Sequence, residues 1–189
     1  MQKIITENET HAVYNLHNKL LEVNVANSLE VQIGQILHRR GLKLALAESC
    51  TGGLIGNRIT DIAGSSEYFW GSVVAYAYEA KAALLNVSWD TLNSRGAVSR
   101  ETVLEMARGA RKALNTDIAV SVSGIAGPGG GTAEKPVGTT WIGLVTEDGA
   151  WAKSFRFSGD RVQNKAYAAD AALQFLLDYL EEKLEKQTT

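Results

Sequence analysis

The sequence predicts an α/β protein, a three-layer α/β/α sandwich whose sheet is mixed and mostly parallel. The apolar run at 43–47 has the length and boundaries of a strand buried on both faces, although periodicity alone leaves a buried helix open, and a second strand is predicted at 118–123. Between them lies a clear helical stripe at 100–114. Near the end, two further runs flank Asp148-Gly149, a strong hairpin signal, so the sheet includes antiparallel strands.

The chain is predicted to form one domain, 27–189, preceded by a loosely structured N-terminal arm at 1–26. The arm shows no clear pattern, and it either stays loosely packed or docks on a second subunit. The domain is predicted to open with a helix in which Asn27 and Glu30 form a capping box and which ends at Gly41.

The stretch after the first strand is the centre of the prediction. Ser49 is expected at the carboxyl end of the strand at 43–47, where open α/β sheets bind ligands. Gly52 and Gly53 permit a tight turn into a helix at 52–63, whose free N–H groups would favour an anion or a developing oxyanion. The alternative is an ordinary serine or threonine helix cap followed by glycines.

The remaining elements follow from periodicity and capping residues. Ser99 is expected to cap its helix, and no internal repeat or interdomain linker is evident. The other predicted elements are strands at 73–75, 118–123, 139–146 and 150–157 and helices at 79–85, 100–114 and 161–184.

Composition excludes several classes of protein. The 189 residues are 45% hydrophobic and 21% charged, ordinary values for a soluble globular protein, and the net charge of −2 does not suggest nucleic-acid or membrane-surface binding. No run approaches a membrane span, and the N-terminus lacks the apolar core of a secretory signal. A single cysteine rules out an intrachain disulfide and suits a reducing compartment, so we expect a cytoplasmic protein.

The positions of the histidines constrain the chemistry. All three, His11, His17 and His38, precede Ser49, and none follows residue 38. A Ser-His-Asp triad or a His/Cys metal site is therefore hard to assemble, and we predict no metal site. If Ser49 is a nucleophile, its base is expected to be a lysine, a tyrosine or a carboxylate.

A second candidate feature is the long loop at 124–138. It contains six glycines and both prolines of the chain, and it has neither a Walker nor a dinucleotide-binding pattern. Such a loop can turn consecutive N–H groups toward an anion, with Lys135 adding charge, or it can be a flexible exposed segment. The candidate ligand-binding residues in it are Gly124, Ile125, Ala126, Gly127, Gly129 and Lys135.

Taken together and in order, six motifs resemble the CinA C-terminal domain family, the nicotinamide-nucleotide amidases. The resemblance covers about 28–184, and its agreement in order and spacing makes it specific. The motifs are Glu48-Ser49-Cys50-Thr51-Gly52-Gly53, the segment from Tyr76 to Lys81, Gly96-Ala97-Val98-Ser99, Ser123-Gly124-Ile125-Ala126-Gly127-Pro128, Glu134-Lys135-Pro136-Val137-Gly138-Thr139 and Gly159-Asp160-Arg161.

The resemblance implies a reaction and a set of residues. It implies hydrolysis of the carboxamide of nicotinamide mononucleotide to nicotinic acid mononucleotide and ammonia, without a cofactor. Ser49 would be the nucleophile, assisted by Tyr76 and Lys81. We expect a small-molecule nucleotide substrate, a homodimer or higher homo-oligomer, and no preceding nucleotide-hydrolysing domain of the kind that full-length members carry.

The substrate-binding residues are predicted from the same motifs. N–H groups from Thr51 to Gly53 are candidates for the oxyanion site, and the glycine loop and Arg161 are candidates for the 5′-phosphate. Where the family most often has Tyr-Ser-Asn-x-x-Lys, this chain has Ala77 and Tyr78. Tyr78 either enters the pocket, where it would obstruct or change substrate binding, or faces the core.

Two alternatives to the amidase remain at this point. The first is a non-catalytic or altered-specificity relative that binds a nucleotide phosphate. The second is a hydrolase that uses Cys50, although a buried cysteine is usually inert.

Overall fold

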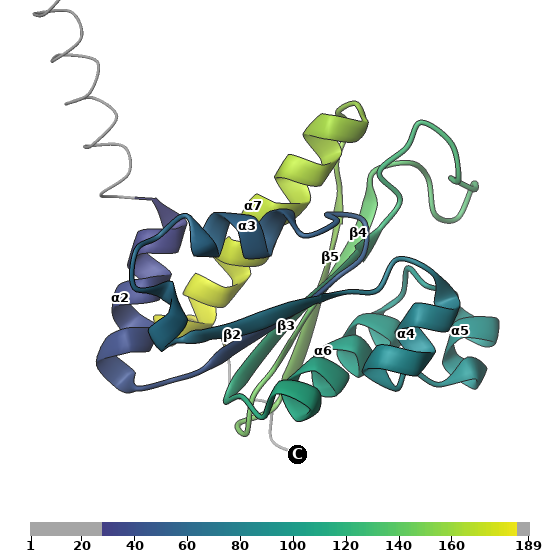
Figure 1. Cartoon of the computed structure of the whole chain (residues 1–189). Coiled ribbons are helices and arrows are strands. Elements are labelled where there is room, and N and C mark those ends of the chain that lie inside the picture. The colour runs from purple at the N-terminus through teal and green to yellow at the C-terminus, as the bar shows by residue number, and fades with distance from the viewer. Residues whose placement is uncertain (1–27, 185–189) are drawn as a thin grey trace, which may run out of the picture.

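The computed structural model describes residues 28–184 (Figure 1). The elements, in chain order, are α2 (Leu29–Arg40), β1 (Leu44–Glu48), α3 (Leu54–Thr60), the short 3₁₀ helix η1 (Ser65–Glu67), β2 (Phe69–Val74), α4 (Tyr78–Leu85), α5 (Trp89–Arg95), α6 (Arg100–Leu114), β3 (Ile118–Gly124), β4 (Thr139–Val145), β5 (Ala150–Arg156) and α7 (Arg161–Leu180). One five-stranded sheet with the order β2-β1-β3-β4-β5 lies between two helical layers. Helices α2, α3 and α7 cover one face and α4, α5 and α6 the other, which confirms the predicted three-layer α/β/α class.

The sheet is less parallel than predicted. Strand β1 pairs in parallel with β2 and β3, whereas β3–β4 and β4–β5 are antiparallel, so the two kinds of pairing are equal in number. The expectation of a mostly parallel sheet is wrong in this respect. The physical reason is that no helix connects β3, β4 and β5, and without a crossover each strand must run back beside the one before it.

Side-chain alternation in β1 divides the core into two. Leu44 and Leu46 pack with α2, α3 and α7, whereas Ala45 and Ala47 face the α4–α6 layer. All five residues of the strand are buried, as predicted for a strand covered on both faces.

The first helix begins one residue later than predicted. Ser28 is its N-cap, and the Ser28 hydroxyl accepts a hydrogen bond from the Val31 N–H. Asn27, the predicted cap, lies outside the described residues, and Glu30 pairs with Arg58 instead of completing a capping box. The predicted end is confirmed, because Gly41 caps the helix in the left-handed conformation at φ 68°.

Two other boundaries differ for local reasons. Helix α3 begins at Leu54 and not at residue 52, because Gly52 and Gly53 have φ values of 66° and 96°, which an α-helix does not accommodate. Strand β2 begins at Phe69, well before the predicted 73–75, because its residues are only partly buried and give no continuous apolar run.

Among the remaining helices, α6 is confirmed from residue 100 to residue 114, with the Ser99 hydroxyl accepting from the Thr102 N–H. Helix α5 was not predicted, because seven residues give too short a periodic pattern. Helix α7 ends at Leu180 and not at residue 184. The predicted arm at 1–26 lies outside the described residues.

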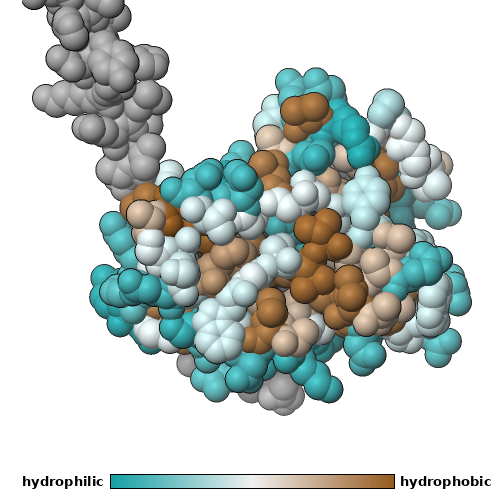
Figure 2. Space-filling view, in the orientation of Figure 1, coloured by the Kyte–Doolittle hydropathy of each residue, from teal (hydrophilic) through white to brown (hydrophobic). Residues whose placement is uncertain are grey.

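Strand β2 is an edge strand and carries the exposed side chains of Trp70 and Val74. Figure 2 shows a group of hydrophobic residues near the centre of this face of the molecule. The expected homo-oligomer stays a prediction.

None of the helices between residues 28 and 184 combines the length and apolar character that crossing a bilayer requires.

Gly109 provides a test of the packing between α4 and α6. A Cβ added there would lie 1.9 Å from the Leu85 carbonyl oxygen, which is backbone at the end of α4. Gly109→Ala is therefore expected to lower the melting temperature by roughly 5 °C, although alanine normally stabilises a helix interior. Gly129→Ala, where an added Cβ meets no atom within 4 Å, is the control and should change little. A Gly109→Ala variant as stable as wild type in scanning calorimetry would show that the two helices can separate freely.

Candidate active site

Ser49 lies at the carboxyl end of β1, against a buried lysine. Lys81, on α4, is fully buried, and its Nζ lies 2.9 Å from Ser49 Oγ. The same Nζ donates to the carbonyl oxygens of Ala75 at 2.8 Å and Tyr76 at 3.2 Å, directly after β2. Three acceptors thus surround one amino group, and one of them is the hydroxyl of the candidate nucleophile.

The protonation of Lys81 determines what this contact can do. Burial lowers the pKa of Lys81 to about 8, because the charged form loses its hydration. A neutral amine has two N–H donors and one lone pair. It can keep both carbonyl contacts and accept the proton of Ser49, so the geometry suits a general base.

Tyr76 contacts this pair only through its backbone. Its carbonyl oxygen accepts from Lys81, whereas its hydroxyl accepts from Arg161 Nη2 at 2.8 Å. The Tyr76 side chain is 59% exposed. Ser49 and Lys81 are therefore brought into contact, and the Tyr76 phenol is directed to α7.

The turn that carries Ser49 is held by Glu48, which sequence reasoning left without a role. Its fully buried carboxylate accepts five hydrogen bonds and donates none. These come from the hydroxyls of Thr51 (2.7 Å) and Ser72 (2.9 Å) and from the N–H groups of Gly53 (2.9 Å), Ile55 (3.2 Å) and Gly56 (2.9 Å). Glu48 thus replaces the missing hydrogen-bond partners at the start of α3 and ties the turn to β2.

This arrangement narrows the predicted oxyanion site. The Gly52 N–H donates to the Ser49 carbonyl, and the Gly53 N–H donates to Glu48, so neither is free for a ligand. The N–H groups of Cys50 and Thr51 donate to no oxygen atom within residues 28–184, and both lie within hydrogen-bonding reach of the Cys50 sulfur. The N–H groups of Gly52 and Gly53, expected to be free at the start of the helix, are therefore occupied.

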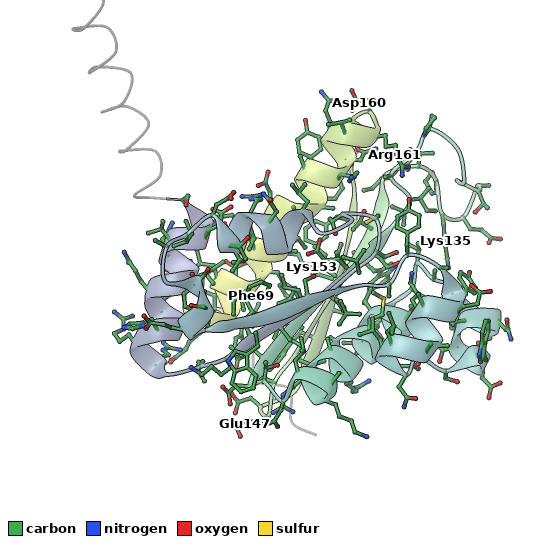
Figure 3. All side chains as sticks on the ribbon, viewed as in Figure 1. Phe69, Lys135, Glu147, Lys153, Asp160 and Arg161 are labelled. Carbon is green, nitrogen blue, oxygen red and sulfur yellow. The ribbon has the colours of Figure 1, made fainter. Side chains whose placement is uncertain are left out.

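Arg161 crosses above the turn. It begins α7 and donates from Nη1 to the Gly127 carbonyl at 2.7 Å and from Nη2 to the Tyr76 hydroxyl. Tyr76 follows β2 and Gly127 follows β3, and β1 lies between these strands in the sheet. The guanidinium therefore spans the end of the strand that carries Ser49. Figure 3 shows Arg161 at the start of α7, beside the loop that follows β3.

The loop at 124–138 is anchored at both ends. The Ile125 N–H donates to the Thr139 carbonyl, and the Gly138 N–H donates to the Ile125 carbonyl. Buried Asn164 on α7 donates to the Ala126 carbonyl at 3.1 Å. Between these anchors, Gly129 is exposed.

Lys135, predicted to add charge near a phosphate, binds elsewhere. Its Nζ donates to the Arg95 carbonyl oxygen at 2.6 Å, at the end of α5 (Figure 3). This contact ties the loop to the α4–α5 side of the molecule.

Tyr78, the departure from the family pattern, begins α4. It is 38% exposed, so it is not a core residue. Its hydroxyl accepts from the Ala97 N–H at 3.1 Å, which directs the side chain toward the segment before α6.

Cys50 has the properties of an inert thiol. It is 5% exposed, and burial raises its pKa to about 11, so the nucleophilic thiolate is scarce near neutral pH.

Four residues of this region were missed by sequence reasoning. The β1–β3 register, which pairs Glu48 with Val122, places Ser123 beside Ser49. Glu48 and Ser123 both lie within the motifs quoted above, and their place in those motifs could have marked them as candidate site residues. Asn164 and Lys165 lie on α7, where the sequence pattern identified only the apolar residues of the helix and gave no signal for the polar ones.

Among residues 28–184, no three His, Cys, Asp or Glu side chains are grouped to hold a metal ion.

Comparison with known proteins identifies the family. The family model described as CinA C-terminal domain matches residues 26–180. This chain belongs to the CinA C-terminal domain family.

Relatives and solved structures agree with this assignment. A Halothermothrix orenii protein carrying the name competence-damage inducible protein is 53% identical over 155 residues, which cover 81% of this chain and 37% of that protein. The chain thus spans little more than a third of the length of such curated relatives. The crystal structure of the competence/damage inducible protein CihA from Agrobacterium tumefaciens is 40% identical with a TM-score of 0.78, and the match covers 81% of this chain and 93% of that one. The competence damage-inducible protein A from Klebsiella pneumoniae is 35% identical with a TM-score of 0.79, covering 82% and 97%.

Replacing the buried carboxylate tests the role of Glu48. Glu48→Gln turns one acceptor oxygen into an NH₂ group that faces donors, so the free energy of unfolding should fall by on the order of 3 kcal/mol. The control is Glu147→Gln, in the exposed β4–β5 turn at the other end of the sheet (Figure 3). Denaturant titration measures both variants. Equal stability of Glu48→Gln and wild type would mean that the turn does not depend on this carboxylate.

Proposed function

We propose that this chain is an amidase that hydrolyses the carboxamide of nicotinamide mononucleotide to nicotinic acid mononucleotide and ammonia. The observation that carries the proposal is the 2.9 Å contact between Ser49 Oγ and the fully buried amino group of Lys81. A buried lysine with a lowered pKa beside a serine hydroxyl is an arrangement suited to a histidine-free serine nucleophile.

The proposed reaction begins with proton transfer from Ser49 to neutral Lys81. The Ser49 oxygen attacks the carboxamide carbon, and the N–H groups of Cys50 and Thr51 stabilise the resulting oxyanion, each by about 3 kcal/mol. When the C–N bond breaks, the Lys81 ammonium returns the proton to the departing nitrogen, and ammonia leaves. Water, deprotonated by Lys81, then attacks the ester carbon. As the bond to Ser49 breaks, the Lys81 ammonium returns the proton to the Ser49 oxygen, and the carboxylic acid is released.

The resemblance of the motifs supports the choice of substrate. Its pyridinium ring withdraws electrons from the amide carbon, so a weakly activated serine can attack it. Tyr76 takes part through the carbonyl oxygen that orients Lys81 and through the hydroxyl that binds Arg161. Arg161 donates to the Gly127 carbonyl of the glycine loop, which supports the proposal that the loop lies near the phosphate of the substrate.

A second candidate function rests on Tyr78. It stands where the family most often has asparagine, and its hydroxyl is engaged by Ala97. A relative with altered specificity would bind the nucleotide phosphate and leave nicotinamide mononucleotide intact. Measuring both the binding and the hydrolysis of nicotinamide mononucleotide therefore separates the two candidates.

Ammonia release tests the nucleophile. Ser49→Ala and Lys81→Met should each lower kcat by at least about 10²-fold, because one removes the attacking oxygen and the other its base. Cys50→Ala is the matched control, since it changes the neighbouring side chain of the same turn and should retain most activity. If Cys50→Ala abolishes turnover while Ser49→Ala remains active, the nucleophile is the thiol.

The pH profile tests the base. Only neutral Lys81 can accept the proton, so kcat/KM should rise about tenfold per pH unit below the lysine pKa and level off above about pH 8. Substrate hydrolysis is followed between pH 6 and 10. A rate that falls across pH 7–9 would require charged Lys81 and contradict its role as base.

A further inference from the structure

Lys165 lies one turn after Arg161 on α7 and faces the turn that carries Ser49. Its Nζ is 3.8 Å from the position that a Cβ on Gly52 would occupy, and no other atom beyond residues 51–53 is within 4 Å of that position. Residues four apart lie on the same face of a helix, so Arg161 and Lys165 approach the turn from one side. The Lys165 amino group therefore lies close to the backbone of the turn at Gly52.

The amino group of Lys165 has no partner within residues 28–184. The half-buried side chain forms no hydrogen bond or ion pair there. By contrast, the half-buried Arg58 pairs with both Glu30 and Asp170. A partly dehydrated ammonium without a counter-charge is unfavourable unless a ligand supplies one.

The neighbouring groups also favour an anion. Arg161 places its guanidinium on the Gly127 carbonyl and the Tyr76 hydroxyl, and the N–H groups of Cys50 and Thr51 lie on the same turn as Gly52. The nearby acids of α7 are engaged, because Asp160 caps the helix and Asp170 binds Arg58. The Glu48 carboxylate beside Gly52 is occupied by five hydrogen bonds, so within residues 28–184 no acid pairs with Lys165.

We infer that Lys165 binds the phosphate monoester of the substrate and so selects a nucleotide over its nucleoside. The inference rests on the proposed function for the identity of the substrate, and it assigns Arg161 a different part. Arg161 braces the loop after β3 against Tyr76, whereas Lys165 supplies the free charge that contacts the phosphate.

Steady-state kinetics with two substrates test this role. Lys165→Met removes the charge and keeps the length, so KM for nicotinamide mononucleotide should rise at least about tenfold, with kcat nearly unchanged. The phosphate-free riboside should be hydrolysed by Lys165→Met as it is by wild type. Lys165→Arg should restore much of the affinity, and Lys112→Met, exposed at the far end of α6, serves as the control. An unchanged KM for the nucleotide in Lys165→Met would overturn the inference and leave the proposed function intact.

A binding measurement separates the two proposals. Calorimetric titration of nicotinamide mononucleotide is carried out in the Ser49→Ala background, with and without Lys165→Met. If wild type hydrolyses neither substrate but Lys165→Met still weakens binding about tenfold or more, the phosphate role stands and the amidase proposal fails. Equal binding with and without Lys165→Met, or no binding in either protein, overturns the phosphate role.

Discussion

The buried carboxylate of Glu48 is the interaction on which the site depends. A strand that ends in a turn with two left-handed glycines leaves several N–H groups inside the protein without helical partners. Glu48 accepts three of them and two hydroxyls, so a single side chain joins β1, α3 and β2. Because successive strand residues point to opposite faces, Glu48 faces α3 while Ser49 is presented to α4. The structural support and the chemistry of the turn therefore lie on opposite sides of the sheet.

The burial of Lys81 depends on the two backbone carbonyls that follow β2, and it lowers the pKa of the amine. An ammonium without water is costly, and the carbonyls of Ala75 and Tyr76 reduce that cost by accepting two of its hydrogen bonds. They are positioned because β2 ends beside β1, where the Ala75 N–H donates to the Glu48 carbonyl. The remaining cost appears as the lowered pKa, which makes a neutral base accessible near pH 8. In the proposed reaction, the stability lost by burying the amine is the source of the reactivity of Ser49.

Strand order assembles the rest of the site. The segments after β2, β1 and β3 are distant in sequence, yet the order β2-β1-β3 places their carboxyl ends side by side. Arg161 connects the two outer segments above the middle one, and Asn164 fixes the start of the glycine loop. The first turns of α7 therefore close the site from the side opposite α4, and a ligand would lie between these two helices.

The sequence by itself determined the three-layer class, α6 with its Ser99 cap, and the hairpin. Through the resemblance of its motifs, it also gave the hypothesis that Lys81 assists Ser49. These depend on local pattern, capping residues or motif order. Only the tertiary structure decided the equal mixture of parallel and antiparallel pairs, the contact of Lys81 with Ser49 and the direction of Tyr76 toward Arg161. It also decided that Glu48 occupies the N–H groups at the start of α3 and that Lys165 faces Gly52 without a partner among residues 28–184. Side-chain direction at a strand end and the neighbours across a sheet depend on register and packing between distant segments, which no local pattern specifies.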